Sequence, residues 1–195
     1  ITARPLTLTA NNQSTTYGTA LPLGTSAYTI SSGSLAVNTN NDAINSVTLQ
    51  YSGNATVAAN TTAGTYSGGI IASAASGTGL GNYNISYSAG TLTVNKATLT
   101  VNADNQTKVY GNANPTLTET ITGFVNGETI AVVSGTPTAT TTATNATGIA
   151  GATITASTSG LSTTNYDFVA GSNGTLTITA RPLTLTANNQ STTYG

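Results

Sequence analysis

Residues 6–18 read LTLTANNQSTTYG, and residues 99–111 echo them as LTVNADNQTKVYG. The Tyr-Gly pairs that end the two segments are 93 residues apart. A longer segment, ITARPLTLTANNQSTTYG at 1–18, returns without change at 178–195, which gives a second period of 177 residues. Self-similarity of this kind is typical of arrays of related modules, so it decides the organisation of the chain before any local element is considered.

Three parts are expected from these periods. Residues 1–95 form a β-rich repeat of a diverged subtype, residues 96–178 form a second β-rich repeat, and residues 179–195 hold the first strand and turn of a further repeat. We interpret the sequence as a window of a longer array in which two unlike repeats alternate. The expected partners of each repeat are therefore the neighbouring repeats of the same chain.

Apolar residues alternate with Thr in the segments that recur, as in LTLTA at 6–10 and GTLTIT at 174–179. A period of two indicates strands with one buried face. Short strands separated by Gly- and Asn-rich breaks predict a mostly β fold of small tandem modules. Each module has at most one short helix; in the second repeat, residues 128–133 are expected to form either such a helix, capped by Asn126, or an extended loop and strand.

The repeats are joined by very short segments. The last strand of one repeat runs through TARP or NKA into the first strand of the next, without a Gly/Ser tether. Proline fixes φ and holds the preceding residue extended. Such restricted joints predict an elongated rod in which each repeat is a spacer. The joint residues are Arg4, Pro5, Lys96, Arg181 and Pro182.

The composition excludes several classes of function. Charged residues make up 5% of the chain and the formal net charge is −1, so there is no basic surface for nucleic acid. No apolar run is long enough for membrane insertion within these residues. The chain has no His and no Cys, which excludes disulfide bonds and zinc–thiolate sites.

The few carboxylates do not suggest an active site. Enzymes need positioned acids, bases or nucleophiles, and no pair of acids recurs at matching positions of the two repeats. We therefore predict no catalytic residue, no metal site and no cofactor. Lys108 is expected to be a solvated lysine at a strand edge; a buried Lys108 beside Glu119 would instead suit an intramolecular isopeptide bond. The acidic residues are Asp42, Asp104, Glu119, Glu128 and Asp167.

Four segments of the second repeat resemble a known family. VYGNANP at 109–115, GFVNGET at 123–129 and the closing NYDF and GTLTI segments are similar to the MBG/YDG-type (YGX) repeat domains. These domains occur in tandem in very large bacterial surface adhesins, including proteins like filamentous haemagglutinin. The first repeat keeps TYG, NYN and GTLTV but lacks a clear GFVNG.

The resemblance implies β-grasp-like modules, in which the first and last strands lie side by side and parallel. An Ig-like β-sandwich is the alternative. The family offers a fold and a role in a stalk, and no catalytic residues.

The recurring Tyr and Gly residues have structural roles in this interpretation. The glycine of each Tyr-Gly pair permits a positive φ where the chain turns, and the tyrosine ring covers the end of the core. An Asn-Pro pair begins the next extended segment of the second repeat, and a later tyrosine anchors a late strand in each repeat. The residues in these roles are Tyr17, Gly18, Tyr110, Gly111, Asn114, Pro115, Tyr83 and Tyr166.

The leading hypothesis is a structural stalk or spacer repeat of a giant bacterial adhesin or extracellular filament, located at the cell surface. One alternative is a glycan-binding module that uses exposed tyrosines such as Tyr87 and Tyr166. A second alternative is lateral self-association through Thr-rich edge strands, which would build a filament or a biofilm matrix.

Overall fold

The computed structural model describes residues 2–195, with the side chains of residues 38 and 39 excepted. The chain folds into two compact units. The first unit holds the chain up to Leu99 together with Gly123–Gly135 and Ser162–Phe168. The second unit holds Thr100–Thr122, Thr136–Leu161 and Val169–Gly195. Two segments of the second sequence repeat thus pack in the same compact unit as the first repeat.

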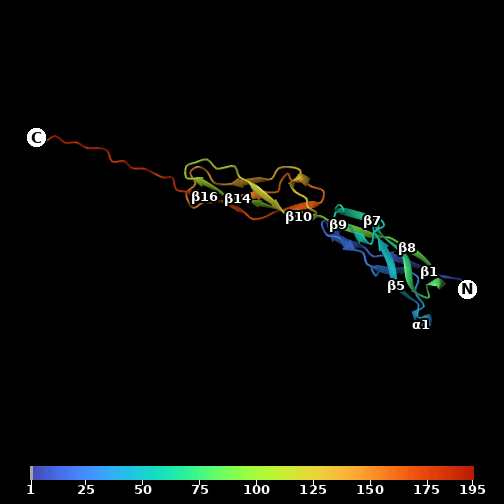
Figure 1. Cartoon of the computed structure of the whole chain (residues 1–195). Helices are drawn as coiled ribbons and strands as arrows, with labels where there is room; N and C mark the ends of the chain where they lie inside the picture. Colours follow the sequence, from blue (N-terminus) through green and yellow to red (C-terminus); the bar gives the residue numbers. More distant parts are fainter. Residues whose placement is uncertain (1) are drawn as a thin grey trace. The chain divides into compact units, whose positions relative to one another are not determined.

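The first repeat is built from nine strands that form three small sheets (Figure 1). Its elements are β1 (Arg4–Ala10), β2 (Gln13–Thr16), β3 (Leu21–Pro22), β4 (Tyr28–Ser32), α1 (Val37–Asn40), β5 (Ala43–Gln50), β6 (Thr56–Val57), β7 (Gly64–Thr78), the 3-10 turn η1 (Leu80–Asn82), β8 (Tyr83–Ser88) and β9 (Gly90–Asn95). The sheets have the strand orders β4-β1-β8, β2-β9-β7-β5 and β3-β6.

The second repeat has a similar plan with fewer strands. Its elements are β10 (Ala97–Ala103), β11 (Gln106–Val109), β12 (Glu119–Thr122), the 3-10 turn η2 (Ile130–Val132), β13 (Thr138–Thr141), β14 (Ala152–Ser157), β15 (Tyr166–Ala170) and β16 (Gly174–Thr179). The strand orders are β12-β10-β15 and β11-β16-β14-β13. The mostly β prediction is confirmed.

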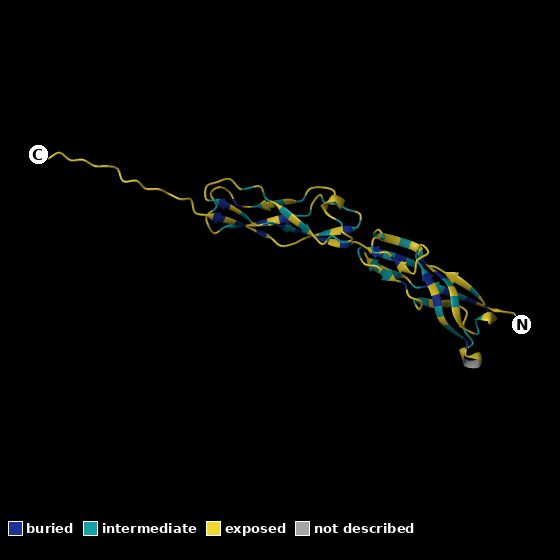
Figure 2. Ribbon diagram, in the orientation of Figure 1, coloured by how far each residue is buried: buried dark blue, intermediate teal, exposed yellow. Residues whose placement is uncertain are grey.

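Burial follows the alternation expected from the sequence (Figure 2). In β1, Leu6 and Leu8 are buried, while Thr7 and Thr9 remain half-exposed. In β16, Leu176 and Ile178 are buried and the intervening threonines are exposed. These two strands therefore place their aliphatic side chains in a thin core and their β-branched threonines on the outer face, where they suit a pleated surface.

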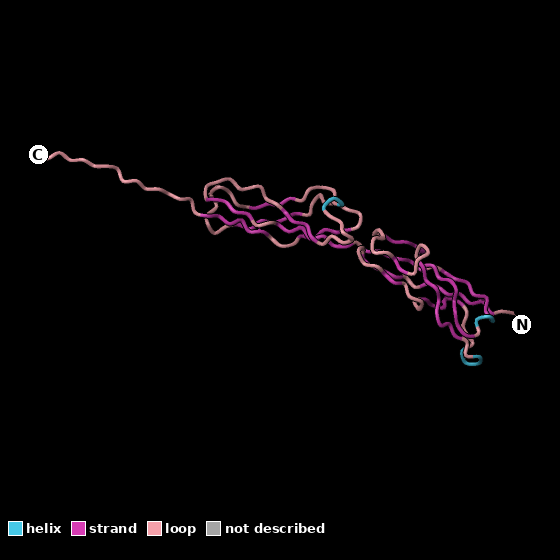
Figure 3. Tube along the Cα trace, in the orientation of Figure 1, coloured by secondary structure: helices cyan, strands magenta, loops and turns pink. Residues whose placement is uncertain are grey.

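The helix expected over 128–133 is only a single 3-10 turn, η2, and its cap is Thr129 rather than Asn126 (Figure 3). The Thr129 side chain accepts a bond from the Ala131 amide. Asn126 lies in a left-handed turn with φ of 54°, a conformation that precedes the helical turn and cannot cap it. None of the helices in the described chain is long and apolar enough to cross a membrane.

The eighteen residues that occur twice adopt two different states. In the first copy they form β1 and β2, whereas residues 180–195 of the second copy form no strand. Leu8 is fully buried, and its counterpart Leu185 is 97% exposed. In the first copy β1 is paired with β4 and β8, whereas no described strand pairs with residues 181–187.

Candidate functional site

The first and last strands of the first repeat lie side by side and parallel. β1 pairs with β8 from Arg4↔Tyr83 to Thr9↔Ser88, and β2 pairs with β9 from Gln13↔Leu92 to Thr16↔Asn95. Both pairings share one offset of 79 residues. The chain segments 4–16 and 83–95 thus keep a single register through the break between β1 and β2. We call these two segments the terminal strand pair.

An asparagine and a glycine hold the terminal strand pair together at that break. The Asn12 Oδ1 accepts a hydrogen bond of 2.8 Å from the Thr91 amide, so a side chain replaces the missing ladder bond. A Cβ on Gly90 would lie 2.5 Å from the carbonyl oxygen of Ala10. Only glycine allows the two backbones to approach so closely.

The second repeat contains the same arrangement. β11 pairs in parallel with β16, and the Asn105 Oδ1 accepts a bond of 2.8 Å from the Thr175 amide across 70 residues. A Cβ on Gly174 would lie 2.4 Å from the carbonyl oxygen of Asp104. Sequence reasoning missed that these Asn and Gly residues join the terminal strands. The echoed NQ and GTLT segments were the available signal.

The Tyr-Gly pairs form turns at the ends of β2 and β11. Gly18 has φ of 92° and Gly111 has φ of 84°, as the turn geometry requires. The Gly18 amide donates to the Ala59 carbonyl at 2.8 Å, and the Gly111 amide donates to the Asn145 carbonyl at 3.2 Å. The two turns are therefore anchored on equivalent loops.

Each repeat also carries a tyrosine bonded to a carboxylate. In the first repeat, the Tyr83 hydroxyl donates to Asp42 Oδ2 at 2.7 Å and accepts a bond from the Ala36 amide at 2.8 Å. The bond to Asp42, together with burial, raises the pKa of Tyr83 above its usual value. Asp42 itself is buried, and this hydroxyl is a hydrogen-bond donor to its side chain.

In the second repeat, Tyr166 bonds to Glu128 in the same way and accepts a bond from the Val125 amide at 3.1 Å. Burial, together with the bond to Glu128, raises the pKa of Tyr166 to about 12. Sequence reasoning found no acid that recurs, because Asp42 and Glu128 lie in loops of unequal length and composition. In both repeats an asparagine comes shortly before the acid, Asn41 before Asp42 and Asn126 before Glu128, and the structure gives both asparagines a left-handed φ.

Glu128 also bonds to a tyrosine of the first repeat, within the first compact unit. The Tyr17 hydroxyl donates to Glu128 Oε1 at 2.8 Å. The Tyr17 and Tyr166 rings lie 5.5 Å apart at 80°, an edge-to-face contact. One carboxylate therefore accepts bonds from two buried tyrosines, and we call Tyr17, Glu128 and Tyr166 the tyrosine cluster.

Two further bonds surround the tyrosine cluster. The Asn126 Nδ2 donates to the Ala59 carbonyl at 3.3 Å, and the Ala63 amide donates to Asn165 Oδ1 at 3.0 Å. A Cβ on Gly18 would lie 2.5 Å from Val125. The turn that ends β2 and the loop that follows β6 thus make a close, hydrogen-bonded contact with residues 125–128 and 165–166.

The predicted joint residues make polar contacts of unequal strength. Arg4 bonds to Ser34 Oγ at 3.3 Å, and Lys96 forms an ion pair of 3.3 Å with Asp167 between two exposed side chains, a type of pair that contributes little stability. Arg181 donates to the Tyr110 carbonyl at 2.9 Å and to Asn112 Oδ1 at 2.6 Å. Pro5 lies in β1 and Pro182 lies in the segment without strands.

The prediction of a solvated Lys108 is wrong, because this residue is buried among polar neighbours and only 6% exposed. Its ammonium donates to Asn114 Oδ1 at 2.8 Å, to the Thr144 carbonyl at 2.6 Å and to the Asn112 carbonyl at 3.4 Å. Three oxygens thus take its three N–H groups. Asn114, expected only to begin an extended segment, accepts a bond from this lysine, and its neighbour Pro115 lies in the stretch without strands between β11 and β12.

A family model for the YGX-type MBG domain matches residues 6–93 and again residues 99–177. The chain belongs to the MBG domain family. No curated protein and no solved structure matches it. The matched Tyr-Gly turns and terminal strands are therefore features of two tandem MBG domains, and the recognition made from the sequence is confirmed.

The chemistry of these sites is that of hydrogen bonding. Among the described residues, no group of three or more Asp, Glu, His or Cys side chains gathers where it could hold a metal ion. The carboxylates at the tyrosine pairs accept bonds from hydroxyl groups and are covered by them. The arrangement connects distant segments of the chain to each other.

Proposed function

We propose that this pair of MBG domains is a load-bearing spacer of a large bacterial surface protein. The terminal strand pair carries the proposal. Because 4–16 and 83–95 run parallel in one register, a pull on the two ends of the repeat draws the strands past each other along their axes. All the bonds between them then resist together, whereas an antiparallel hairpin pulled from its open end would lose its bonds one at a time.

The break between β1 and β2 would be the weak point of this pair. The Asn12–Thr91 bond and the close approach at Gly90 keep the two stretches connected there. The same pair of features at Asn105 and Gly174 supports a shared mechanical role in both domains. The parallel terminal strands also suit the β-grasp-like description, which we propose in preference to an Ig-like sandwich.

Single-molecule stretching of the chain tests this function. We expect one rupture event for each of the two domains, and Asn12→Ala should lower the rupture force of the first domain. Asn54→Ala is the matched control, because the Asn54 side-chain Nδ2 donates only to the Ser52 carbonyl of its own turn. A featureless extension of the unaltered chain would contradict the proposal.

The proposed setting is the outside of a bacterial cell, where the domains would link or project the adhesive parts of a longer protein. The family relationship and the tandem arrangement support this setting. The shortage of charged and reactive side chains is consistent with a structural rather than a catalytic role.

Self-association is a second candidate, favoured by one observation. β13, which reads TATT, lies at the edge of its sheet and exposes a row of threonines. An exposed edge is a template for a further strand. Sedimentation velocity over a wide range of concentrations would reveal assembly. The glycan alternative has less support, because Tyr166 is 1% exposed and, of the two tyrosines considered for it, only Tyr87, which is 39% exposed, could offer its ring to a sugar.

A further inference from the structure

The tyrosine cluster depends on two surfaces that meet within the first compact unit. One surface carries Tyr17 and Ala63 from the first domain, and the other carries Glu128, Asn165 and Tyr166. When they meet, Tyr17 is left only 5% exposed and Tyr166 only 1%. Each surface has a counterpart elsewhere in the chain, because both domains share the same plan.

The counterpart of the Tyr17 surface lies on the second domain. Tyr110 occupies the place of Tyr17. The loop whose carbonyl accepts a hydrogen bond from the Gly111 amide has the same turn as its counterpart in the first domain. In that turn the Thr61 amide donates to the Ala58 carbonyl, and the Thr147 amide donates to the Thr144 carbonyl. Two residues beyond each turn, Ile149 stands where Ala63 does. Tyr110 and Ile149 are 44% and 69% exposed, so this surface is uncovered.

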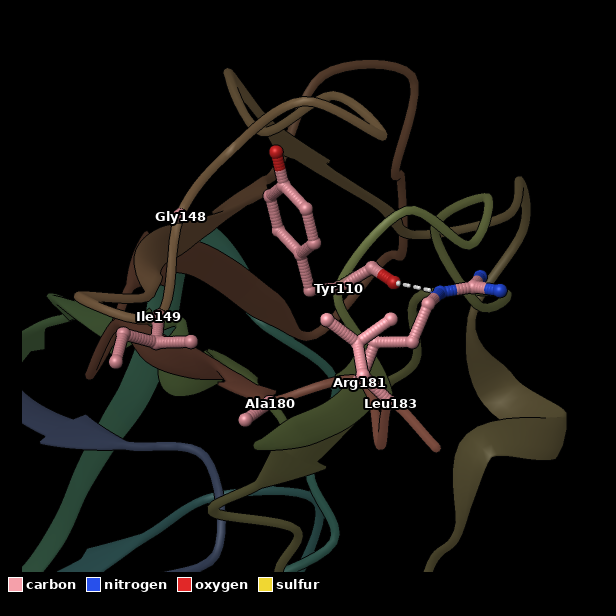
Figure 4. A pocket seen from close by; sticks show the side chains of 6 residues that line it. All are labelled: Tyr110, Gly148, Ile149, Ala180, Arg181 and Leu183. Atoms are coloured by element: carbon pink, nitrogen blue, oxygen red, sulfur yellow. Dashed lines mark hydrogen bonds between the residues drawn. The ribbon is translucent and has the colours of Figure 1, made fainter. Parts of the chain in front are cut away.

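Tyr110 and Ile149 line a hollow of about 360 Å³ together with Ala180, Arg181 and Leu183 (Figure 4). The Arg181 guanidinium bonds to the Tyr110 carbonyl, while the phenol ring projects away from it. Segment 178–195, which repeats the start of the first domain, therefore already lies beside the uncovered tyrosine.

The counterpart of the Glu128–Tyr166 surface lies at the start of the first domain. Asp42 and Tyr83 line a hollow of about 390 Å³ together with Thr2, Arg4 and Asn82. Asn82 precedes Tyr83 as Asn165 precedes Tyr166. Here too the entering segment of the domain, in the form of Thr2 and Arg4, borders the tyrosine and its carboxylate.

We propose that the Tyr110–Ile149 surface binds the Asp42–Tyr83 end of a domain with the sequence of residues 1–95, reached through the segment 178–195. The Tyr110 hydroxyl would then bond to the aspartate as Tyr17 bonds to Glu128, and the Ile149 amide would bond to the asparagine as Ala63 bonds to Asn165. Two observations support this occupant: the matched residues on both surfaces, and the entering sequence of such a domain already in place in the hollow.

This interface goes beyond the load-bearing function and does not depend on it. It is tested by extending the chain after Gly195 with residues 19–95 again, and by comparing amide hydrogen exchange in the 195-residue and extended chains. We expect the amides of residues 110–112 and 148–150 to be protected about tenfold more in the extended chain. Tyr110→Ala should abolish this gain.

Two variants sharpen the test. Tyr17→Ala, in the interface already seen, should expose the equivalent amides of the first domain by a similar factor. Tyr194→Ala, in the Tyr-Gly turn of the added third domain, should leave residues 110–112 and 148–150 unchanged. Equal exchange at those residues in the short and extended chains would overturn the proposal. So would added residues that exchange freely, since docking requires the third domain to fold against the second.

Discussion

The close approach at Gly90 makes a specific prediction for the substitution Gly90→Ala. The added Cβ would lie 2.5 Å from the Ala10 carbonyl oxygen and 2.7 Å from that of Asn11, whereas non-bonded heavy atoms prefer about 3.5 Å. Both obstacles are backbone atoms, so a side-chain rotation cannot relieve them. The terminal strand pair must separate by roughly 1 Å at its break, which weakens the Asn12–Thr91 bond.

The magnitude follows from three contributions. Overpacking costs about 1–3 kcal/mol, and the weakened hydrogen bond costs about 1 kcal/mol. Replacing glycine by alanine returns about 0.4–1 kcal/mol by restricting the unfolded chain. The free energy of unfolding of the first domain should therefore fall by roughly 1–3 kcal/mol. Gly174→Ala should have a similar effect on the second domain, because its Cβ would lie 2.4 Å from the Asp104 carbonyl.

Urea unfolding followed by tyrosine fluorescence and circular dichroism measures these changes. Gly81→Ala and Gly148→Ala are matched controls, since a Cβ at either position meets nothing within 4 Å, and each should stay within about 0.5 kcal/mol of the parent protein. If Gly90→Ala and Gly174→Ala unfold at the same urea concentration as these controls, the close contact of the terminal strands does not stabilise the domains.

Four further predictions concern the tyrosine cluster, the buried lysine and the repeated segment. The folded pKa of Tyr166, about 12, lies above the usual 10.0. The resulting stabilisation is complete below pH 10 and falls by on the order of 2 kcal/mol as the pH rises toward 12. In urea unfolding at rising pH, Tyr166→Phe should therefore lose less unfolding free energy than the parent protein. Tyr17→Phe should lower the free energy of unfolding by about 1–3 kcal/mol in the parent protein, because the Tyr17 hydroxyl bonds to a charged group. The same change should cost less in the Glu128→Gln background. Additive effects in this double-mutant cycle would contradict the Tyr17–Glu128 bond. Lys108→Met should destabilise the second domain by about 1–3 kcal/mol by leaving buried oxygens without donors, and an unchanged urea midpoint would refute the buried site. Leu8→Ala should cost roughly 2–5 kcal/mol, whereas the same change at Leu185, which is 97% exposed, should leave the midpoint unaltered.

Local sequence was sufficient to predict the type of most elements. The alternation of Leu with Thr predicts strands at β1 and β16, because side chains of a strand point to opposite faces in turn. The positive φ of Gly18 and Gly111 follows from the same local reasoning, since a tight turn after a strand often needs a residue without Cβ. These features depend on residues that are neighbours in the sequence.

The bonds that hold the domains together could not be predicted in this way. Asn12 and Thr91 are 79 residues apart, and their pairing becomes visible only when the register of the parallel strands is known. Lys108 is predicted to be solvated because lysine is common on exposed strand edges. Its burial depends instead on the Thr144 carbonyl, which lies 36 residues away. Because every residue has a backbone carbonyl, the order of the side chains does not show which carbonyl will accept such a bond.

The two Tyr-Gly turns show most directly how the same motif acquires different environments. Tyr17 and Tyr110 end equivalent strands, yet one is 5% and the other 44% exposed. The difference cannot come from their own segments, which are alike; it comes from Glu128 and Tyr166, which cover only the first. The same holds for residues 4–16, which form β1 and β2 beside β4, β8 and β9, whereas their counterparts 181–193 form no strand. In a protein with so few charges and such thin cores, a motif specifies what a surface can bind, and its neighbour along the chain decides whether that surface is buried.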